Sequence, residues 1–270
     1  MPGAPWQRHD LVGLGAGAWA RVLAGDAGEP PWDETALEAL RHWAAADLPL
    51  VVARQAPTWP GEDGREIVTL GLPAPLAWGR RRLFVRTALG GLRQRGKFPR
   101  LAPIGRELPA EARAACACLA AALDAAGVAA RVYGSFGWQA LTGLAYRHAD
   151  SDLDLLLPVA DAAQADAAVR ALAQAACARP RPDGELLFAD GRAVAWREWA
   201  AWRAGRVASL LVKHLRGAEL VPGAEMPPDG ARVPGATLLP GAARVPGAAR
   251  VPGEAQVRDE ARVSDEAPFR

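Results

Sequence analysis

The feature that most constrains this chain is a pair of aspartates spaced to share one face of a β-strand. Asp152 and Asp154 alternate with leucines in the run SDLDLLL at residues 151–157. Successive side chains of a strand point to opposite faces, so the two carboxylates share a face, about 6.5–7 Å apart along the chain, and the leucines point into a core. Two such carboxylates repel each other unless a cation lies between them. The cation best suited to carboxylate and phosphate oxygens is Mg²⁺.

A Gly-Ser pair upstream of the acidic strand completes the pattern. Gly134 and Ser135 end an apolar run, and a Gly-Ser turn can offer backbone N–H groups and a hydroxyl to phosphate oxygens. A helix expected over residues 136–144 would point its N-terminal amides at the same anion. Two acids on a strand, taken alone, can also be a solvated face. Together with the Gly-Ser turn they indicate phosphoryl transfer to an acceptor.

Hydrophobic periodicity predicts a mixture of helices and strands over most of the chain. Further helices are expected over residues 33–46, 110–126 and 161–177, and within 197–217. Strands are expected over residues 48–53, 66–72, 82–85, 128–133 and 152–159. A hairpin is expected over residues 184–189 and 192–196, around Asp190-Gly191. The segment 97–108, which carries two prolines, is expected to be a connector.

The last part of the chain has a different composition. Copies of ARVPGA occupy residues 231–236 and 243–248, and ARVPGE follows at 249–254. Proline in every copy removes donors that a β-ladder would need, and the segment has too little apolar bulk to form a core. We therefore expect residues 223–270 to be disordered and to carry no chemistry, so that residues 226–270 can be deleted without loss of activity.

Overall composition excludes several classes of protein. A net charge of +2 gives no case for general nucleic-acid binding. Three cysteines, two of them in a CxC within an alanine-rich run, describe neither a disulfide framework nor a zinc site. The sequence has no secretory signal and no run of about 18 apolar residues. We expect a cytoplasmic protein that binds neither nucleic acid nor a membrane.

The motifs, in their order along the chain, resemble a known family. This order is similar to that of the nucleotidyltransferase superfamily related to DNA polymerase β: a helix, a strand, a Gly-Ser pair, a second helix and a strand with Asp-x-Asp. The wider set is similar to the phosphoribosyl-dephospho-CoA transferase family, the holo-acyl-carrier-protein synthase of malonate decarboxylase, over roughly residues 6–222. The segments that carry this resemblance are RHDL (8–11), PLVVAR (49–54), GSFGWQALTGL (134–144), SDLDLLL (151–157) and DGELLFADGRAVAWREW (183–199).

The resemblance implies a fold and a reaction. The expected fold is α+β: an N-terminal α+β domain (1–104), a nucleotidyltransferase-like domain with a mixed sheet and flanking helices (105–222), and the repeat tail (223–270). The family transfers the 2'-(5''-phosphoribosyl)-3'-dephospho-CoA group from triphosphoribosyl-dephospho-CoA to a serine of the malonate decarboxylase acyl-carrier protein and releases pyrophosphate. Its motif aspartates correspond to Asp152 and Asp154, which would bind Mg²⁺, while Gly134 and Ser135 would contact the substrate.

The superfamily pattern also requires a third carboxylate on a later strand. The candidates are Asp183, Glu185, Asp190 and Glu198. The Asp-Gly turn accounts for Asp190, and a helix start accounts for Glu198. We favour Asp183, which alternates with Glu185 on the strand that enters from PRPDGELLF.

Three basic residues are further candidates for the site. Lys213, one of only two lysines, is expected on the last apolar helix, where it contacts a triphosphate or is simply a solvated helix end. Arg54 ends the strand expected over residues 48–53, where side chains often face a ligand cleft. His9 could serve as a general base, although a turn stabilised by Asp10 explains the RHD cluster equally well.

Two other functions remain open on this evidence. One is an ATP-dependent nucleotidyltransferase that adenylylates a hydroxyl of a small molecule. The other is a non-catalytic module that binds a carrier protein, with the acidic strand as a charged docking face. A comparison of affinity for ATP with affinity for dephospho-CoA derivatives distinguishes the adenylylating enzyme from the favoured transferase. Metal binding distinguishes the non-catalytic module, which would bind no metal, from the favoured transferase.

Overall fold

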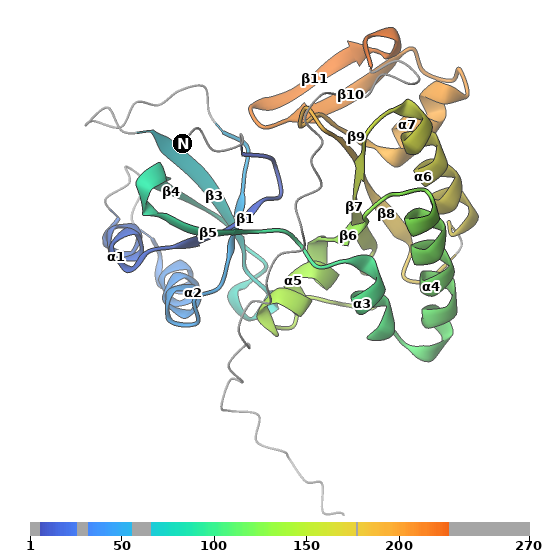
Figure 1. Ribbon diagram of the computed structural model, residues 1–270. Coiled ribbons are helices and arrows are strands. Elements are labelled where there is room, and N and C mark those ends of the chain that lie inside the picture. Colours follow the sequence, from blue (N-terminus) through green and yellow to red (C-terminus); the bar gives the residue numbers. More distant parts are fainter. Residues whose placement is uncertain (1–5, 26–31, 56–65, 177, 227–270) are drawn as a thin grey trace, which may run out of the picture.

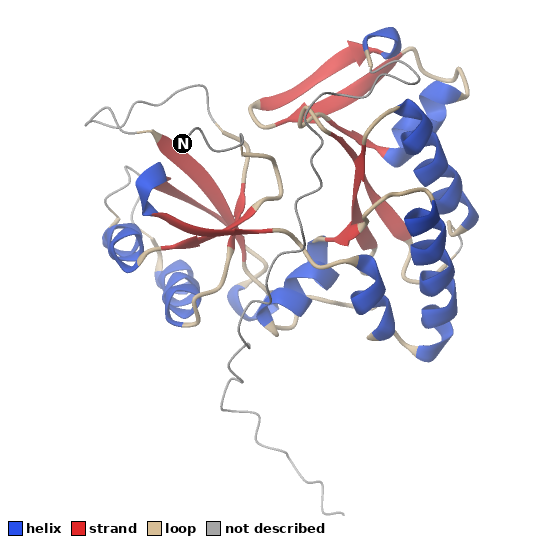
Figure 2. Cartoon of the chain, viewed as in Figure 1, coloured by secondary structure: helices blue, strands red, loops and turns tan. Residues whose placement is uncertain are grey.

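The computed structural model describes residues 6–25, 32–55, 66–176 and 178–226. These residues form two β-sheets with helices packed on them, so the expected α+β class is confirmed (Figures 1 and 2). Cys177 and almost all of the repeat tail lie outside the described residues. None of the helices within these ranges is long and apolar enough to cross a membrane.

The N-terminal sheet is antiparallel and has the strand order β4-β3-β2-β1-β5. Its strands are β1 (Leu11–Leu14), β2 (Leu50–Val52), β3 (Ile67–Pro73), β4 (Arg82–Ala88) and β5 (Leu92–Gly96). Two helices, α1 (Ala16–Ala24) and α2 (Glu34–Ala45), pack on one face with buried Trp19, Leu40 and Trp43. Helix α2 begins where Asp33 accepts a hydrogen bond from the Ala36 N–H at 2.9 Å, which satisfies one amide of the first turn.

Side-chain alternation divides this sheet into two different faces. Leu70 and Leu72 of β3, with Leu83 and Val85 of β4, point to the helices and are buried there. Residues between them point the other way, toward the C-terminal part of the molecule. Val51 of β2 lies opposite Gly71 and shares this second face, since it packs against the cluster that joins the two sheets.

The C-terminal sheet is mixed and has the order β11-β10-β9-β8-β7-β6, in which only β7 and β8 are parallel. Its strands are β6 (Arg131–Val132), β7 (Leu153–Val159), β8 (Pro182–Phe188), β9 (Ala193–Ala195), β10 (Ser209–His214) and β11 (Gly217–Pro222). The helices of this part are α3 (Leu101–Arg106), α4 (Ala110–Ala125), α5 (Gly134–Thr142), α6 (Ala162–Gln174) and α7 (Trp196–Arg203). Helices α4, α6 and α7 lie on the side of the sheet away from the N-terminal part (Figure 1).

The acidic strand β7 uses the alternation expected from its sequence. Leu153, Leu155 and Leu157 are buried in the core beneath the helices. Asp154 and Leu156 therefore face the N-terminal sheet, where Leu156 joins a small cluster between the two sheets. Leu11, Phe98 and Trp138 complete that buried cluster. It holds the two sheets together at the base of the space that separates them.

Several elements differ from those expected. Residues 97–108 are not a simple connector, because α3 forms there. Pro103 is the third residue of that helix, where its missing N–H costs no intrahelical hydrogen bond. The expected boundary at residue 104 falls within this helix, whose Leu101 and Ile104 pack into the C-terminal core. Strand β1 and helix α1 were not predicted at all.

The region 197–217 was wrongly expected to end as a helix. Helix α7 ends at Arg203, and Gly205 follows with a φ of +69° that favours glycine. Strand β10 then places Leu210 and Val212 in the core on alternate positions, which is strand periodicity. Lys213 consequently lies on a strand.

The start of the tail was also placed too early. Strand β11 runs to Pro222, and a short 3₁₀ turn over Gly223–Glu225 brings Met226 into the C-terminal core. The Gly223 N–H donates to the Ala208 carbonyl at 3.0 Å. A deletion that starts at residue 226 would therefore remove a core side chain.

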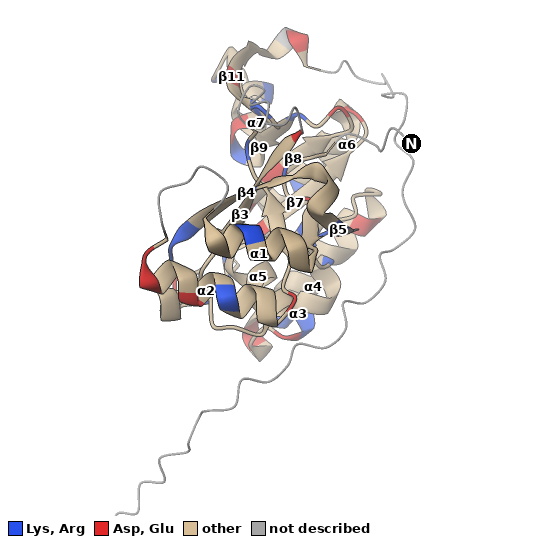
Figure 3. Cartoon of the chain, turned by 90° about the vertical axis from the view of Figure 1, so that its left-hand side faces the viewer, with Lys and Arg blue, Asp and Glu red and all other residues tan. Residues whose placement is uncertain are grey.

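Charged residues are interspersed over the molecule. Seen from the side of α1 and α2, basic and acidic positions of both signs occur along the ribbon, mostly singly (Figure 3). Many of them pair: Arg81 with Asp33 at 2.5 Å, and Arg93 with Asp47 at 2.6 Å. These exposed pairs contribute little to stability.

Met226→Ala is expected to destabilise the protein by about 2 kcal/mol, because a Met side chain that is 3% exposed would leave a cavity. The measurement is chemical denaturation, with the exposed neighbour Glu225→Ala as the matched control. Equal midpoints for Met226→Ala and the wild-type chain would show that the turn after β11 does not stabilise the core.

Candidate functional site

A cleft of about 850 Å³ lies between the two sheets. On the N-terminal side it is lined by four arginines and by apolar residues, without an acid among the described lining residues; we call this side the basic wall. Its arginines are Arg8, Arg54, Arg80 and Arg82. The C-terminal side, the acidic wall, carries the aspartates of the SDLDLLL strand and the Gly-Ser pair. Its aspartates are Asp152 and Asp154 of that segment and Asp150, which precedes it.

The Gly-Ser pair begins a helix rather than preceding one. Helix α5 starts at Gly134, two residues earlier than expected, and Ser135 lies in its first turn on the cleft. No side chain caps this end, so amides of the first turn are free to meet an anion in the cleft. Gly134 has a φ of +59°, a conformation that L-residues with a side chain rarely adopt.

Gly134 is also required by the close approach of Asp154. A Cβ atom at residue 134 would overlap the Asp154 carboxylate. Strand β7 supports this approach, because the Tyr133 N–H donates to the Asp154 carbonyl at 3.0 Å. The Gly-Ser and Asp-x-Asp motifs therefore meet at one point, with the Asp154 side chain against the N-terminus of α5.

Asp154 has no positive partner within the described part of the chain. It forms no ion pair or side-chain hydrogen bond there. Burial raises its pKa to about 6, and the negative charges of Asp183, Asp152 and Glu185 act in the same direction. The protein thus keeps a half-buried carboxylate whose charge it does not neutralise.

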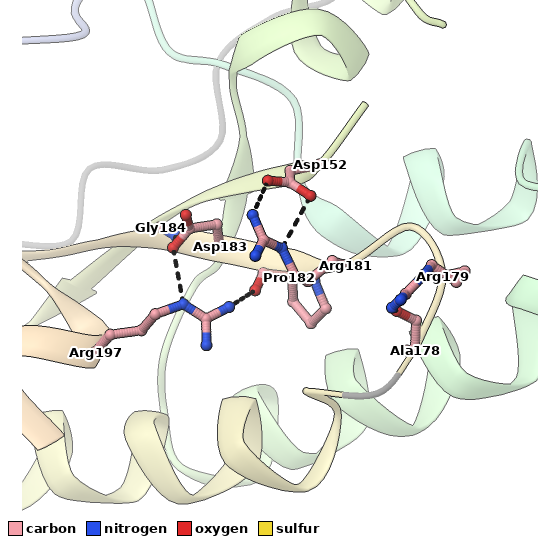
Figure 4. A network of polar contacts seen from close by, with 8 residues as sticks. All are labelled: Asp152, Ala178, Arg179, Arg181, Pro182, Asp183, Gly184 and Arg197. Carbon is pink, nitrogen blue, oxygen red and sulfur yellow. Dashed lines mark hydrogen bonds and ion pairs between the residues drawn. The ribbon is translucent and has the colours of Figure 1, made fainter. Parts of the chain in front are cut away.

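The two neighbouring aspartates, in contrast, each face an arginine (Figure 4). Asp152 accepts two hydrogen bonds from Arg181, at 2.5 Å and 3.1 Å, and this guanidinium lowers the pKa of Asp152. Asp183 lies 3.8 Å from the Arg197 Nε and accepts the Gly184 N–H at 2.8 Å. Because β7 and β8 are parallel with Asp154 opposite Asp183, these two carboxylates lie on the same side of the sheet, and the charges of Asp183 and Asp152 both act on Asp154.

A second polar group, centred on Glu185, joins the two sides of the cleft. Glu185 is buried on β8, and its Oε1 accepts a hydrogen bond from Lys213 Nζ at 2.6 Å. Its Oε2 lies 3.5 Å from His9 Nε2 and 3.8 Å from Arg8 Nη1. Burial raises the pKa of Glu185, but its contacts with His9, Lys213 and Arg8 outweigh burial and bring the pKa to about 2. Glu185 is therefore ionised, and it holds the segment before β1 against the C-terminal sheet.

The structure brings most of the predicted site residues together. Those that line the cleft are Gly134, Ser135, Asp152, Asp154, Arg54 and Lys213. Asp183 lies one strand away, opposite Asp154. Lys213 reaches the cleft from β10 and not from a helix end, which corrects the expected location. Arg54 follows β2, as expected, and is exposed.

Several residues of the site were not singled out from the sequence. Arg181 and Arg197 are distant in sequence from the aspartates that they face, and no pattern links them. For Glu185 the sequence offered one signal, its alternation with Asp183 on a strand. Its pairing with Lys213 and His9 depends on long-range packing.

The carboxylates of the acidic wall offer the oxygen ligands that Mg²⁺ prefers. No three His, Cys, Asp or Glu side chains within the described ranges are arranged as a ready metal site. The unneutralised charge of Asp154 and the second carboxylate of Asp152 nevertheless fit a cation that takes its remaining ligands from a bound phosphate and water. Arg181 would have to release Asp152 for both aspartates to take part.

Comparisons with known proteins agree with this arrangement. Residues 7–98 match the family model described as phosphoribosyl-dephospho-CoA transferase MdcG N-terminal domain, and residues 100–224 match the corresponding C-terminal domain. A protein of Xanthomonas campestris pv. campestris (strain 8004) named phosphoribosyl-dephospho-CoA transferase is 39% identical over 220 residues, which covers 80% of this chain and 93% of the relative. No solved structure gives a significant match.

More distant relatives carry the same name. The protein of Bradyrhizobium diazoefficiens (strain JCM 10833) is 33% identical over 218 residues, covering 80% of this chain and 90% of the relative. That of Pseudomonas fluorescens (strain ATCC BAA-477) is 34% identical over 223 residues, covering 80% and 92%. The chain is thus an enzyme of the transferase class. It belongs to the phosphoribosyl-dephospho-CoA transferase family.

Asp154→Asn is expected to stabilise the metal-free protein at neutral pH. The raised pKa means that the folded state binds more protons than the unfolded state between about pH 4 and pH 6, so wild-type stability falls as pH rises through that window. The variant escapes this loss, which we place at about 1–2 kcal/mol for a partly exposed group, or about 3–6 °C in Tm.

Thermal unfolding with a chelator present, at pH 4 and at pH 7.5, tests this expectation. The Tm difference between Asp154→Asn and the wild type should be near zero at pH 4 and positive at pH 7.5. The control is Glu38→Gln, at an exposed position of α2 that forms no ion pair among the described residues, whose effect should not grow over this range. A difference that is the same at both pH values would contradict the charge-crowding account.

Proposed function

We propose that this enzyme transfers the 2'-(5''-phosphoribosyl)-3'-dephospho-CoA group from triphosphoribosyl-dephospho-CoA to a serine of the malonate decarboxylase acyl-carrier protein. Pyrophosphate is the leaving group. The observation that carries the proposal is Asp154, a half-buried carboxylate set against the N-terminus of α5, with no cationic partner among the residues that the structure describes. We place the reaction in the cytoplasm.

Mg²⁺ is the proposed cofactor, held by Asp152 and Asp154. When bound it would supply positive charge to the phosphate oxygens of the donor and to the attacking oxygen. The fit rests on the oxygen ligands and on the charge that the protein leaves uncompensated at Asp154. Asp183 is the proposed third carboxylate, because its strand register sets it opposite Asp154.

The residues of the chain have separate tasks in this proposal. Gly134 and Ser135 hold the leaving pyrophosphate with the first-turn amides of α5 and the serine hydroxyl. Lys213 and Arg54 reach the cleft from opposite sides and contact phosphate oxygens. Preorganised donors of this kind stabilise charge that develops during transfer without reorganisation.

His9 is the proposed general base for the incoming serine hydroxyl. Its imidazole lines the cleft, and Glu185 lies at 3.5 Å from Nε2, so an imidazolium that forms during transfer would face an ionised carboxylate. The Tyr133 ring also packs against the imidazole, with ring centroids 4.8 Å apart. His9 thus contacts both Glu185 and Tyr133.

Membership in the family favours this reaction over the two alternatives. Relatives named as transferases argue against a non-catalytic module that binds a carrier protein. Adenylylation of a small molecule by ATP would use the same aspartates, and only the choice of donor separates it from the proposed transfer.

Asp154→Ala and Asp152→Ala are each expected to reduce transfer by about 100-fold or more, because the Mg²⁺ that would balance the phosphate charge would lose one of its protein ligands. The measurement is transfer of label from the donor to purified carrier protein at saturating Mg²⁺. Asp190→Ala, which removes an acid from the turn after β8, is the matched control and should keep wild-type rates.

Near wild-type transfer by Asp154→Ala would contradict the site assignment. Labelling of the carrier protein with ATP as donor, but not with the dephospho-CoA derivative, would instead support the adenylylating alternative.

A further inference from the structure

A row of residues crosses the cleft face of the N-terminal sheet beside the arginines of the basic wall. Val51 of β2 lies opposite Gly71 of β3, and Gly71 lies opposite Phe84 of β4. Residues directly opposite in antiparallel strands point to the same side of the sheet. All three line the cleft. Because Gly71 has no side chain, its backbone is exposed between the side chains of Val51 and Phe84. Each of these lies about one strand spacing from Gly71.

Phe84 is unusually exposed for an aromatic residue in a strand. Its exposed fraction is 51%, and Leu76, which also lines the basic wall, is 66% exposed. The ring stands beside the open floor that Gly71 provides. A flat ring next to a gap in the side-chain layer can stack on a planar group, and nucleic-acid bases are planar groups that stack well on aromatic side chains.

The charged side chains around Phe84 indicate which chemical groups the ligand has besides a planar ring. Arg82 lies two residues before Phe84 and so points to the same face of β4. Arg54 and Arg80 line the same wall. Within the described residues, none of these three arginines forms an ion pair. Arginine binds phosphate oxygens in a bidentate manner, so the wall suits a phosphorylated ligand with a planar base.

We propose that Phe84 and the open backbone at Gly71 form the stacking site for the adenine ring of the donor, with Arg82 and Arg54 on its diphosphate. This inference rests on the proposed function, which supplies a dephospho-CoA derivative as the ligand. It divides the donor between the two sides of the cleft: the basic wall binds the adenosine diphosphate portion, and the acidic wall receives the end that reacts. A cleft of about 850 Å³ is within the range for a ligand of this size.

Calorimetric titration of dephospho-CoA, which lacks the triphosphoribosyl group, into the full chain tests the site without catalysis. Phe84→Ala is expected to weaken binding by about tenfold, since base stacking on an aromatic ring is lost. Phe84→Trp, which keeps an aromatic face, should stay within about threefold of wild type. Gly71→Ala, whose new methyl group would lie 3.2 Å from Val51 Cγ1 and intrude on the floor, should also weaken binding.

Two controls separate stacking from general effects. Leu220→Ala removes an exposed apolar side chain, 69% exposed on β11 and outside the cleft lining, and should leave the Kd unchanged. Binding of 4'-phosphopantetheine, which has no adenine, should not respond to Phe84→Ala. Wild-type affinity of Phe84→Ala for dephospho-CoA would overturn the proposal, and so would an equal loss for 4'-phosphopantetheine or a wild-type chain that does not bind dephospho-CoA.

The failure of this inference is distinguishable from failure of the proposed function. If adenine binding depends on Phe84 but the chain transfers nothing to carrier protein, the stacking site is supported and the proposed reaction is wrong. If Phe84→Ala transfers the group with an unchanged KM for the donor, the proposed reaction is supported and the stacking site is wrong.

Discussion

The structure depends on one close contact, between the Asp154 carboxylate and the backbone of Gly134. It is possible only because residue 134 has no side chain and accepts a positive φ. The contact joins the start of α5 to strand β7 and so fixes the acidic wall. It also sets a carboxylate against the start of a helix, among other acids, and no cation of the described residues balances its charge. A carboxylate held at such a cost in stability is typical of functional sites.

The two polar groups of the cleft have opposite effects on the pKa of the carboxyl group at their centre. Around Glu185, positive side chains from both parts of the molecule surround one buried carboxylate, and its pKa falls to about 2. Around Asp154, carboxylates surround a carboxylate, and its pKa rises to about 6. The first arrangement stabilises the association of the two sheets. In the proposed reaction, magnesium would supply the positive charge that the second arrangement lacks.

Local sequence determined much of this site, and long-range packing determined the rest. Alternation along SDLDLLL correctly separated the aspartates from the core leucines. The helix expected to begin at residue 161 does begin there, where Asp161 accepts the Gln164 N–H and caps α6. Lys213 was misplaced because LLVKH has an apolar run too short to distinguish strand from helix. The arginines that face Asp152 and Asp183 come from other elements. No local pattern could therefore reveal that Asp154, of the three aspartates, has no cationic partner within the described ranges.

Proton release on Mg²⁺ binding is the most direct test of the claim that Asp154 carries the uncompensated charge. Calorimetry at pH 5.5 in buffers of different ionisation enthalpy measures it. With a pKa near 6, Asp154 is mostly protonated at this pH, so magnesium binding should release about three quarters of a proton from the wild type and none from Asp154→Asn. Equal magnesium affinity and equal proton release in the two proteins would contradict the account.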